Sequence, residues 1–263
     1  MTSRPTRRMA LAGVAGLVLA LPAPASAAPT ETRVVGGRPA AEGAYPWTAY
    51  LGGCGGSLVS PDIIMSAAHC FGSNSTRVTA YVGKVRKGEG TRRTGSSLRR
   101  GVPADNDEDQ RPPDNVSDWA VIKLDQPITD IAPVAVPADD RFDSTPVFRA
   151  MGWGRTSENG PTSSTLLEVD VPFVPDDQCA RSVGKAEICA GYLKEGGRDT
   201  CYGDSGGPLA ARDGDRWVLV GLTSWGKGCA RAGEPGHYAQ VSAFIPDMKA
   251  AIRTLGGTLP AGW

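Results

Sequence analysis

One serine of the chain lies in a glycine-rich segment, Gly203-Asp204-Ser205-Gly206-Gly207-Pro208. Because glycine carries no side chain, a turn of this kind lets another backbone approach the Ser205 hydroxyl closely. The same turn leaves backbone N–H groups free to stabilise a negatively charged oxygen. The segment therefore favours a nucleophilic serine, although a G-x-S-x-G match by itself also occurs in ordinary turns.

A serine hydroxyl needs a base to become a nucleophile near neutral pH. The sequence contains two histidines, of which His69 follows an apolar run and His237 is expected to be a wall or surface residue. Asp118 starts a second apolar run, where a buried acid must be hydrogen-bonded and a histidine N–H is one suitable partner. Ser205, His69 and Asp118 are therefore candidates for a nucleophile, a base and an acid that binds the base, although His69 or Asp118 alone would also fit a structural role.

The order of these residues separates two classes of serine hydrolase. In the α/β-hydrolase class the serine is followed by the acid and then by the histidine, on alternating strands and helices. Here His69 and Asp118 both precede Ser205, and little of the chain has helical periodicity. The order therefore argues against an esterase of that class.

The elements that must position these residues are predicted to be mainly strands. Short apolar runs alternate with Gly, Pro, Asn and Asp, which is typical of an all-β sandwich or barrel. The expected strands cover residues 56–59, 63–67, 77–82, 120–124, 147–152, 166–171 and 218–224. A helix is predicted over residues 243–255, where apolar side chains recur on one face, and a helical turn over residues 175–181.

Residues 84–115 differ in composition from the rest of the chain. Basic side chains come first, acidic ones follow, and two consecutive prolines stand near the end. We interpret this segment as a solvated surface excursion, with a site for an ion or a partner as the alternative.

Residues 1–27 have the three parts of a secretory signal peptide. Arg4, Arg7 and Arg8 precede the apolar run of residues 9–21, and Ala25-Ser26-Ala27 fits a cleavage site. The alternative is a membrane anchor, which would need about 20 apolar residues. The sequence thus predicts a secreted, extracellular protein with no membrane attachment after removal of the signal peptide.

Export to an oxidising compartment predicts that the six cysteines form three disulfides. Their spacing alone leaves all of the roughly 15 possible pairings open. A zinc site is the alternative, but the chain has no C-x-x-C pair and only two histidines, so we expect no metal and no cofactor. The 28 basic and 28 acidic residues cancel, which provides no field for attracting nucleic acid.

Three motifs taken together resemble the chymotrypsin/trypsin family in type and order. They are Ala67-Ala68-His69-Cys70, Asp118-Trp119-Ala120 and Gly203-Asp204-Ser205-Gly206-Gly207-Pro208. The resemblance covers residues 34–252 and is closest over residues 188–209. It implies an all-β fold of two six-stranded antiparallel β-barrels with a C-terminal α-helix, in a protease domain at residues 34–263.

The activity implied by the resemblance is hydrolysis of peptide bonds after Arg or Lys by a secreted serine endopeptidase. Ser205, His69 and Asp118 would form the catalytic triad, and the backbone N–H groups of Gly203 and Ser205 the oxyanion hole. Ser224 would share in the hydrogen bonding of Asp118. The implied partners are protein or peptide substrates and protein protease inhibitors, and the expected state is a monomer.

The resemblance also implies a specificity pocket. Asp199, six residues before Ser205, would lie at its base. The neighbouring residues would be Ser224, Trp225, Gly226 and Gly236, the two glycines being small enough to admit a long side chain. A buried carboxylate there would pair with Arg bidentately and with Lys as a point charge. An acid in a glycine-rich turn is otherwise an ordinary turn residue.

The segment Arg33-Val34-Val35-Gly36-Gly37 resembles the activation junction of the family. Residues 28–33 would be a short propeptide cleaved after Arg33, and the freed amine of Val34 would pair with a buried Asp204. The uncut chain would then be a zymogen. Without the downstream motifs, Arg33 would simply precede a strand.

The same resemblance pairs Cys54 with Cys70, Cys179 with Cys189, and Cys201 with Cys229. Residues 84–115 lack the paired acids of a vertebrate-type calcium loop, so calcium dependence is not expected. Asn74 and Asn115 begin two glycosylation sequons. Two other functions remain open, a pseudo-protease that only binds and a hydrolase of small esters.

Overall fold

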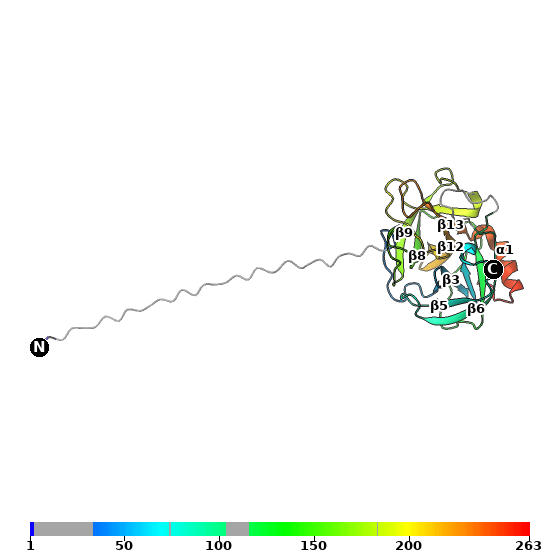
Figure 1. Ribbon diagram of the computed structural model, residues 1–263, viewed down its shortest axis with the longest axis horizontal. Coiled ribbons are helices and arrows are strands. Elements are labelled where there is room, and N and C mark those ends of the chain that lie inside the picture. Colours follow the sequence, from blue (N-terminus) through cyan, green and yellow to red (C-terminus); the bar gives the residue numbers. More distant parts are fainter. Residues whose placement is uncertain (3–33, 74, 104–115, 183) are drawn as a thin grey trace. The chain divides into compact units, whose positions relative to one another are not determined.

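A computed structural model describes residues 1–2, 34–73, 75–103, 116–182 and 184–263 of the chain (Figure 1). Residues 31–263 form one compact unit, which contains all the described residues except the first two. The expected signal peptide beyond its first two residues, the expected propeptide with Arg33, and both sequon asparagines lie outside the described residues.

The first barrel consists of six antiparallel strands that close in the order β2-β3-β4-β7-β6-β5. These strands are β2 (Thr48–Tyr50), β3 (Gly55–Ser60), β4 (Ile63–Ser66), β5 (Val78–Val82), β6 (Thr91–Arg100) and β7 (Ala120–Leu124). The last residue of β4, Ser66, pairs with the first residue of β7, Ala120. Antiparallel pairing at this point brings the segment that follows β4 beside the segment that precedes β7, so His69 and Asp118 become neighbours.

The second barrel comes after the first in the chain and has the strand order β9-β10-β13-β12-β11-β8. Pairing of β8 with β9 closes it, and the short strand β1 (Arg38–Pro39) pairs with β9 from outside. Its strands are β8 (Val147–Gly152), β9 (Leu167–Val174), β10 (Glu187–Ala190), β11 (Pro208–Asp213), β12 (Arg216–Trp225) and β13 (Gly236–Gln240). Pro208 pairs with Leu222, so the serine turn before β11 lies beside the end of β12.

Helical structure among the described residues is short except at the C-terminal end. Three 3-10 turns cover Ala68–Cys70, Gly184–Ala186 and Ser242–Phe244. The helix α1 (Ile245–Thr254) has proline in its first turn and buries Met248, Ala251 and Ile252. Figure 1 shows α1, in red, beside the first barrel, where it contacts β6 and β7. The predicted helix over residues 243–255 is therefore confirmed apart from its ends.

The predicted fold of two six-stranded antiparallel barrels with a C-terminal helix is confirmed. All seven predicted strands are present, with small shifts at their ends. The strands that the pattern missed are β1, β2, β6, β10, β11 and β13. They are short or contain Gly, Pro or charged residues, which look like turn signals in a sequence. The helical turn expected over residues 175–181 is instead a series of hydrogen-bonded turns.

The interpretation of residues 84–115 as a surface excursion is wrong for residues 91–100, which form β6. Most side chains of this strand are Arg, Thr or Ser, and only Gly95 among its ten residues is fully buried. A Cβ atom on Gly95 would lie 2.4 Å from the side chain of Ile122 on β7, so the glycine allows the two strands to pack closely. The strand was missed because its buried positions carry almost no apolar side chain.

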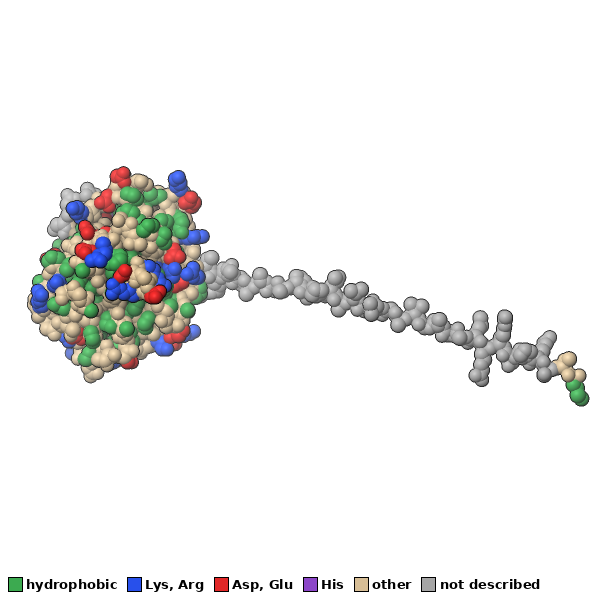
Figure 2. Space-filling view, turned by 180° about the vertical axis from the view of Figure 1, so that it is seen from behind, with side chains coloured by type: hydrophobic (Ala, Val, Ile, Leu, Met, Phe, Trp, Pro, Cys, Tyr) green, Lys and Arg blue, Asp and Glu red, His purple; other side chains and the backbone are tan. Residues whose placement is uncertain are grey.

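The structure contains three disulfides, Cys54–Cys70, Cys179–Cys189 and Cys201–Cys229, which is the pairing that the family resemblance implies. No helix among the described residues is long and apolar enough to cross a membrane. On the face shown in Figure 2, basic and acidic side chains are interspersed with hydrophobic ones.

Candidate active site

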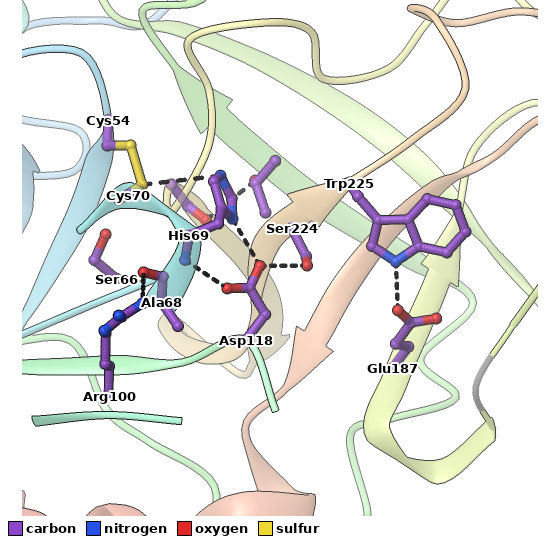
Figure 3. A network of polar contacts seen from close by, with 12 residues as sticks. Cys54, Ser66, Ala68, His69, Cys70, Arg100, Asp118, Glu187, Ser224 and Trp225 are labelled. Atoms are coloured by element: carbon purple, nitrogen blue, oxygen red, sulfur yellow. Dashed lines mark hydrogen bonds and ion pairs between the residues drawn. A yellow bond between two sulfur atoms is a disulfide. The ribbon is translucent and has the colours of Figure 1, made fainter. Parts of the chain in front are cut away.

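Asp118 lies just before β7 and is almost completely buried, with 2% of its side chain exposed. Its Oδ1 accepts the backbone N–H of His69 at 2.8 Å. Its Oδ2 accepts Nδ1 of His69 at 2.7 Å and the hydroxyl of Ser224 at 2.5 Å (Figure 3). Burying a carboxylate is costly unless hydrogen bonds replace its water, and three donors do so here. These bonds fix the carboxylate relative to both barrels.

The hydrogen bond to Asp118 determines which tautomer His69 adopts. A carboxylate can only accept hydrogen bonds, so the bond from His69 to Asp118 requires the proton on Nδ1 and leaves a lone pair on Nε2. The residue lies in the 3-10 turn after β4, and the Cys54–Cys70 disulfide fixes this turn to the start of β3. Arg100 of β6 donates a hydrogen bond to the carbonyl of Ala68 at 3.4 Å. These two interactions fix the backbone turn that carries the imidazole of His69, which is thereby positioned as a potential base.

The turn that carries Ser205 packs against the chain that leads into His69. The N–H of Gly55, next to Cys54, donates to the carbonyl of Ser205 at 2.8 Å. A Cβ atom on Gly206 would lie only 2.9 Å from the backbone nitrogen of Ala67. On the other side, the N–H of Gly206 donates to Thr223, the residue before Ser224.

The structure therefore brings Ser205, His69 and Asp118 to one site between the two barrels. Among the described residues, the ring of His69 is hydrogen-bonded to Asp118 and not to the Ser205 hydroxyl. Catalytic hydrogen bonds of this kind often become short only when a substrate is bound.

Two backbone donors belong to the same glycine-rich turn as Ser205. In the part of the chain that the structure describes, the N–H groups of Gly203 and Ser205 donate to no backbone or side-chain acceptor. Gly203 has a φ of +95°, a conformation that glycine adopts without strain. Two unengaged N–H groups beside a serine can stabilise an oxyanion.

A cavity of about 230 Å³ opens beside Ser205. Asp199 lies in its wall together with Ser224, Trp225, Gly226 and Gly236. A Cβ atom on Gly236 would lie 2.7 Å from Oδ1 of Asp199, so no larger residue fits there without displacing the carboxylate. The cavity thus lies beside the serine and carries an acidic group.

Asp199 is buried at the cavity wall and has hydrogen bonds but no cationic partner among the described residues. Its Oδ1 accepts the N–H of Thr200 at 2.7 Å and the hydroxyl of Tyr238 at 3.0 Å. Burial raises the pKa of Asp199 to about 7, and these donors only partly oppose the effect. Sequence reasoning missed Tyr238, although it lies two residues after Gly236 on one strand and so on the same face of the sheet.

Asp204 is a second buried carboxylate, with no exposed surface. It accepts the N–H groups of Gly154 at 2.7 Å and Cys201 at 2.9 Å. Burial raises the pKa of Asp204 to about 6, and the positive charge of Lys87 lowers it slightly. No described cation lies within ion-pair distance of this carboxylate.

Val34 is fully buried in the core of the second barrel. Its φ is +52°, which is rare and strained for a β-branched residue. The next residue, Val35, accepts a hydrogen bond from the N–H of Asp199 at 3.2 Å. The start of residues 34–263 is therefore attached directly to the cavity wall.

Comparison with known proteins agrees with this architecture. Residues 34–247 match the family model described as Trypsin. The chain is 38% identical over 261 residues to a trypsin-like protease of Streptomyces glaucescens, an alignment that covers 95% of this chain and 94% of the relative. It is 33% identical over 254 residues to the venom serine protease Bi-VSP of Bombus ignitus, covering 83% and 68%.

The chain belongs to the trypsin family. It is a serine endopeptidase, and its substrates are proteins.

The raised pKa of Asp199 predicts that small amidinium or guanidinium ions bind better as the pH rises. Below about pH 7 the carboxyl group is largely protonated and neutral, so affinity should fall about tenfold for each further pH unit. Titration calorimetry between about pH 5 and 8 measures this dependence. Asp199→Asn, with its similar shape and no charge, should bind weakly at every pH. An equal affinity of the wild type at both ends of the range would contradict the prediction.

Proposed function

We propose that the protein is a secreted endopeptidase that cleaves peptide bonds after Arg or Lys through a triad of Ser205, His69 and Asp118. The observation that carries this proposal is the pair of hydrogen bonds from the backbone and ring of His69 to the buried Asp118, beside a serine turn with two unengaged N–H groups. Such an arrangement supplies a nucleophile, a base and an oxyanion site within one cleft.

In the proposed mechanism, Oγ of Ser205 attacks the carbonyl carbon of the cleaved bond while Nε2 of His69 takes the hydroxyl proton. Asp118 stabilises the imidazolium that forms and keeps its orientation. The N–H groups of Gly203 and Ser205 stabilise the oxyanion of the tetrahedral intermediate. His69 then gives its proton to the leaving amine, and the acyl-enzyme is hydrolysed by water in the reverse sequence of proton transfers.

Specificity for basic residues is supported by the cavity that carries Asp199. Its glycine walls, Gly226 and Gly236, leave room for a long side chain, and the buried carboxylate of Asp199 offers it an anion. Arg would pair with this carboxylate bidentately, and Lys as a point charge. The same site would accept an exposed Arg or Lys of a protein inhibitor. We propose that the enzyme acts as a monomer.

Activation by cleavage after Arg33 is supported by two features, one at Asp204 and one at Val34. Asp204 is buried with no cation within ion-pair distance among the described residues, and the φ of Val34 lies in the left-handed region. Cleavage would remove the carbonyl group that makes this φ unfavourable and would create an α-ammonium group able to pair with Asp204. Residues 28–33 would be the propeptide, and residues 1–27 the signal peptide that directs secretion.

Asp118→Asn should lower kcat by about 10⁴-fold, because a carboxamide that donates to Nδ1 would leave the proton of His69 on Nε2. Steady-state kinetics with an Arg peptide measure this loss. Ser224→Ala, which removes only one of the three donors to Asp118, is the matched control and should lose far less. Equal losses in the two variants would contradict the assigned role of Asp118.

Asp199→Ser should remove the preference for Arg and Lys, since it eliminates the anion in the cavity while leaving the triad in place. Profiling of cleavage sites on a peptide library tests this. A variant that still prefers basic residues would show that another group determines specificity.

Arg33→Gln should give a precursor that stays uncut and reacts slowly with a phosphonylating reagent, because Asp204 would lack its cation. The control is a precursor in which residues 28–33 are replaced by the recognition site of an unrelated protease, which should gain full reactivity on cutting before Val34. An uncut precursor as reactive as the cut enzyme would refute the zymogen proposal.

A further inference from the structure

Behind the cleft wall formed by Trp225 lies a buried histidine that the triad does not use. The ring of His237 stacks on the indole of Trp225, with centroids 3.6 Å apart and an angle of 17° between the planes. The two residues pair across β12 and β13. One face of the indole is therefore covered by an imidazole.

Glu187 of β10 connects both rings. Its Oε1 accepts the indole N–H of Trp225 (Figure 3), and its Oε2 lies 3.1 Å from Nδ1 of His237. The side chains of Glu187 and His237 are only 2% and 3% exposed. β13 lies between β10 and β12 in the sheet. His237 pairs with Trp225 on β12 and with Cys189 on β10, and Glu187, two residues before Cys189 on the same face, reaches His237 diagonally. We call these three polar side chains, Glu187, His237 and Trp225, the row.

This arrangement carries a desolvation penalty. A buried acid and imidazole lose their hydration, and well-packed hydrophobic residues of similar size are often as stabilising or more so. Hydrogen bonds and stacking do, however, restrict the torsions of the indole, which a purely apolar contact would leave less defined. A role in orienting Trp225 accounts for a polar row at this position.

The row is also joined to the specificity cavity. Trp225 lines the cavity and is partly exposed, so the indole contributes to the surface that a substrate meets. Gly236 immediately precedes His237 and donates its N–H to Asp199. The charged groups nearby are Arg181, whose guanidinium lies 5.9 Å from the indole centroid, and Lys227, which forms an ion pair with Glu234.

We propose that His237 and Glu187 are positioning residues that hold Trp225 as a rigid wall for the substrate residues beyond the one whose side chain enters the cavity. This inference rests on the proposed function. A fixed indole binds a peptide without first losing torsional freedom, whereas a loose one must be ordered on binding. Loss of the row should therefore weaken peptide binding more than it slows the chemical step.

The test compares His237→Val, which removes both stacking and the hydrogen bond, with His237→Phe, which keeps a flat ring against Trp225. Each is assayed with a single-residue Arg ester and with an Arg-containing hexapeptide. A phosphonylating reagent that labels Ser205 counts the folded active sites, so misfolded protein does not distort kcat.

We expect His237→Val to raise KM for the hexapeptide about tenfold and that for the ester much less, with kcat changing about threefold or less. His237→Phe should recover most of the loss. In a Trp225→Phe background, His237→Val should have little further effect on KM, because its target is gone.

A hexapeptide KM equal to that of the wild type, an equal rise for the ester and the hexapeptide, or a full effect in the Trp225→Phe background would each overturn the inference. A wild-type enzyme that cleaves neither substrate and is not labelled at Ser205 would instead overturn the proposed function, and the inference with it.

Discussion

The site depends on holding one buried carboxylate, that of Asp118, in a fixed orientation by hydrogen bonds. Three donors surround it, two from His69 and one from Ser224, and they come from both barrels. This requirement explains why the end of β4, the start of β7 and the end of β12 must meet. It also decides the chemistry, because an acceptor at Nδ1 of His69 leaves Nε2 as the basic atom.

Two further buried carboxylates lack a cation among the described residues. Burial raises the pKa of both Asp199 and Asp204 well above that of an exposed aspartate. Their folded-state pKa values exceed those of the unfolded chain, so their contribution to stability is greatest below about pH 4 and is lost as the pH rises through about 6 to 7. Each would be relieved by a positive charge, a substrate side chain for Asp199 and the Val34 amine for Asp204. The free energy of unfolding is thus lower than it would be with both carboxylates paired. The missing cations are those that substrate binding and activation would supply.

The sequence predicted the barrels and the members of the site better than it predicted the surroundings of the site. Ser205, His69 and Asp118 could be picked out as candidates because each stands in a distinctive local motif: Ser205 in a glycine-rich turn, His69 after an apolar run and Asp118 before one. β6 could not, because it pairs through its backbone while Gly95 replaces the apolar side chain that would have marked it. Likewise, the row of Glu187, His237 and Trp225 depends on contacts between three strands, and Glu187 is 38 residues from Trp225 and 50 from His237 in the sequence, so no local pattern reveals it.

Nitrogen-15 NMR of the histidine rings tests the role of Asp118 most directly, because it reports which ring nitrogen carries the proton. His69 can be assigned by comparison with His237→Phe, which leaves a single histidine in the chain. We predict that neutral His69 is protonated at Nδ1, with that proton in a strong hydrogen bond that Asp118→Asn abolishes. Protonation at Nε2, or rapid exchange between the two tautomers, would contradict this role.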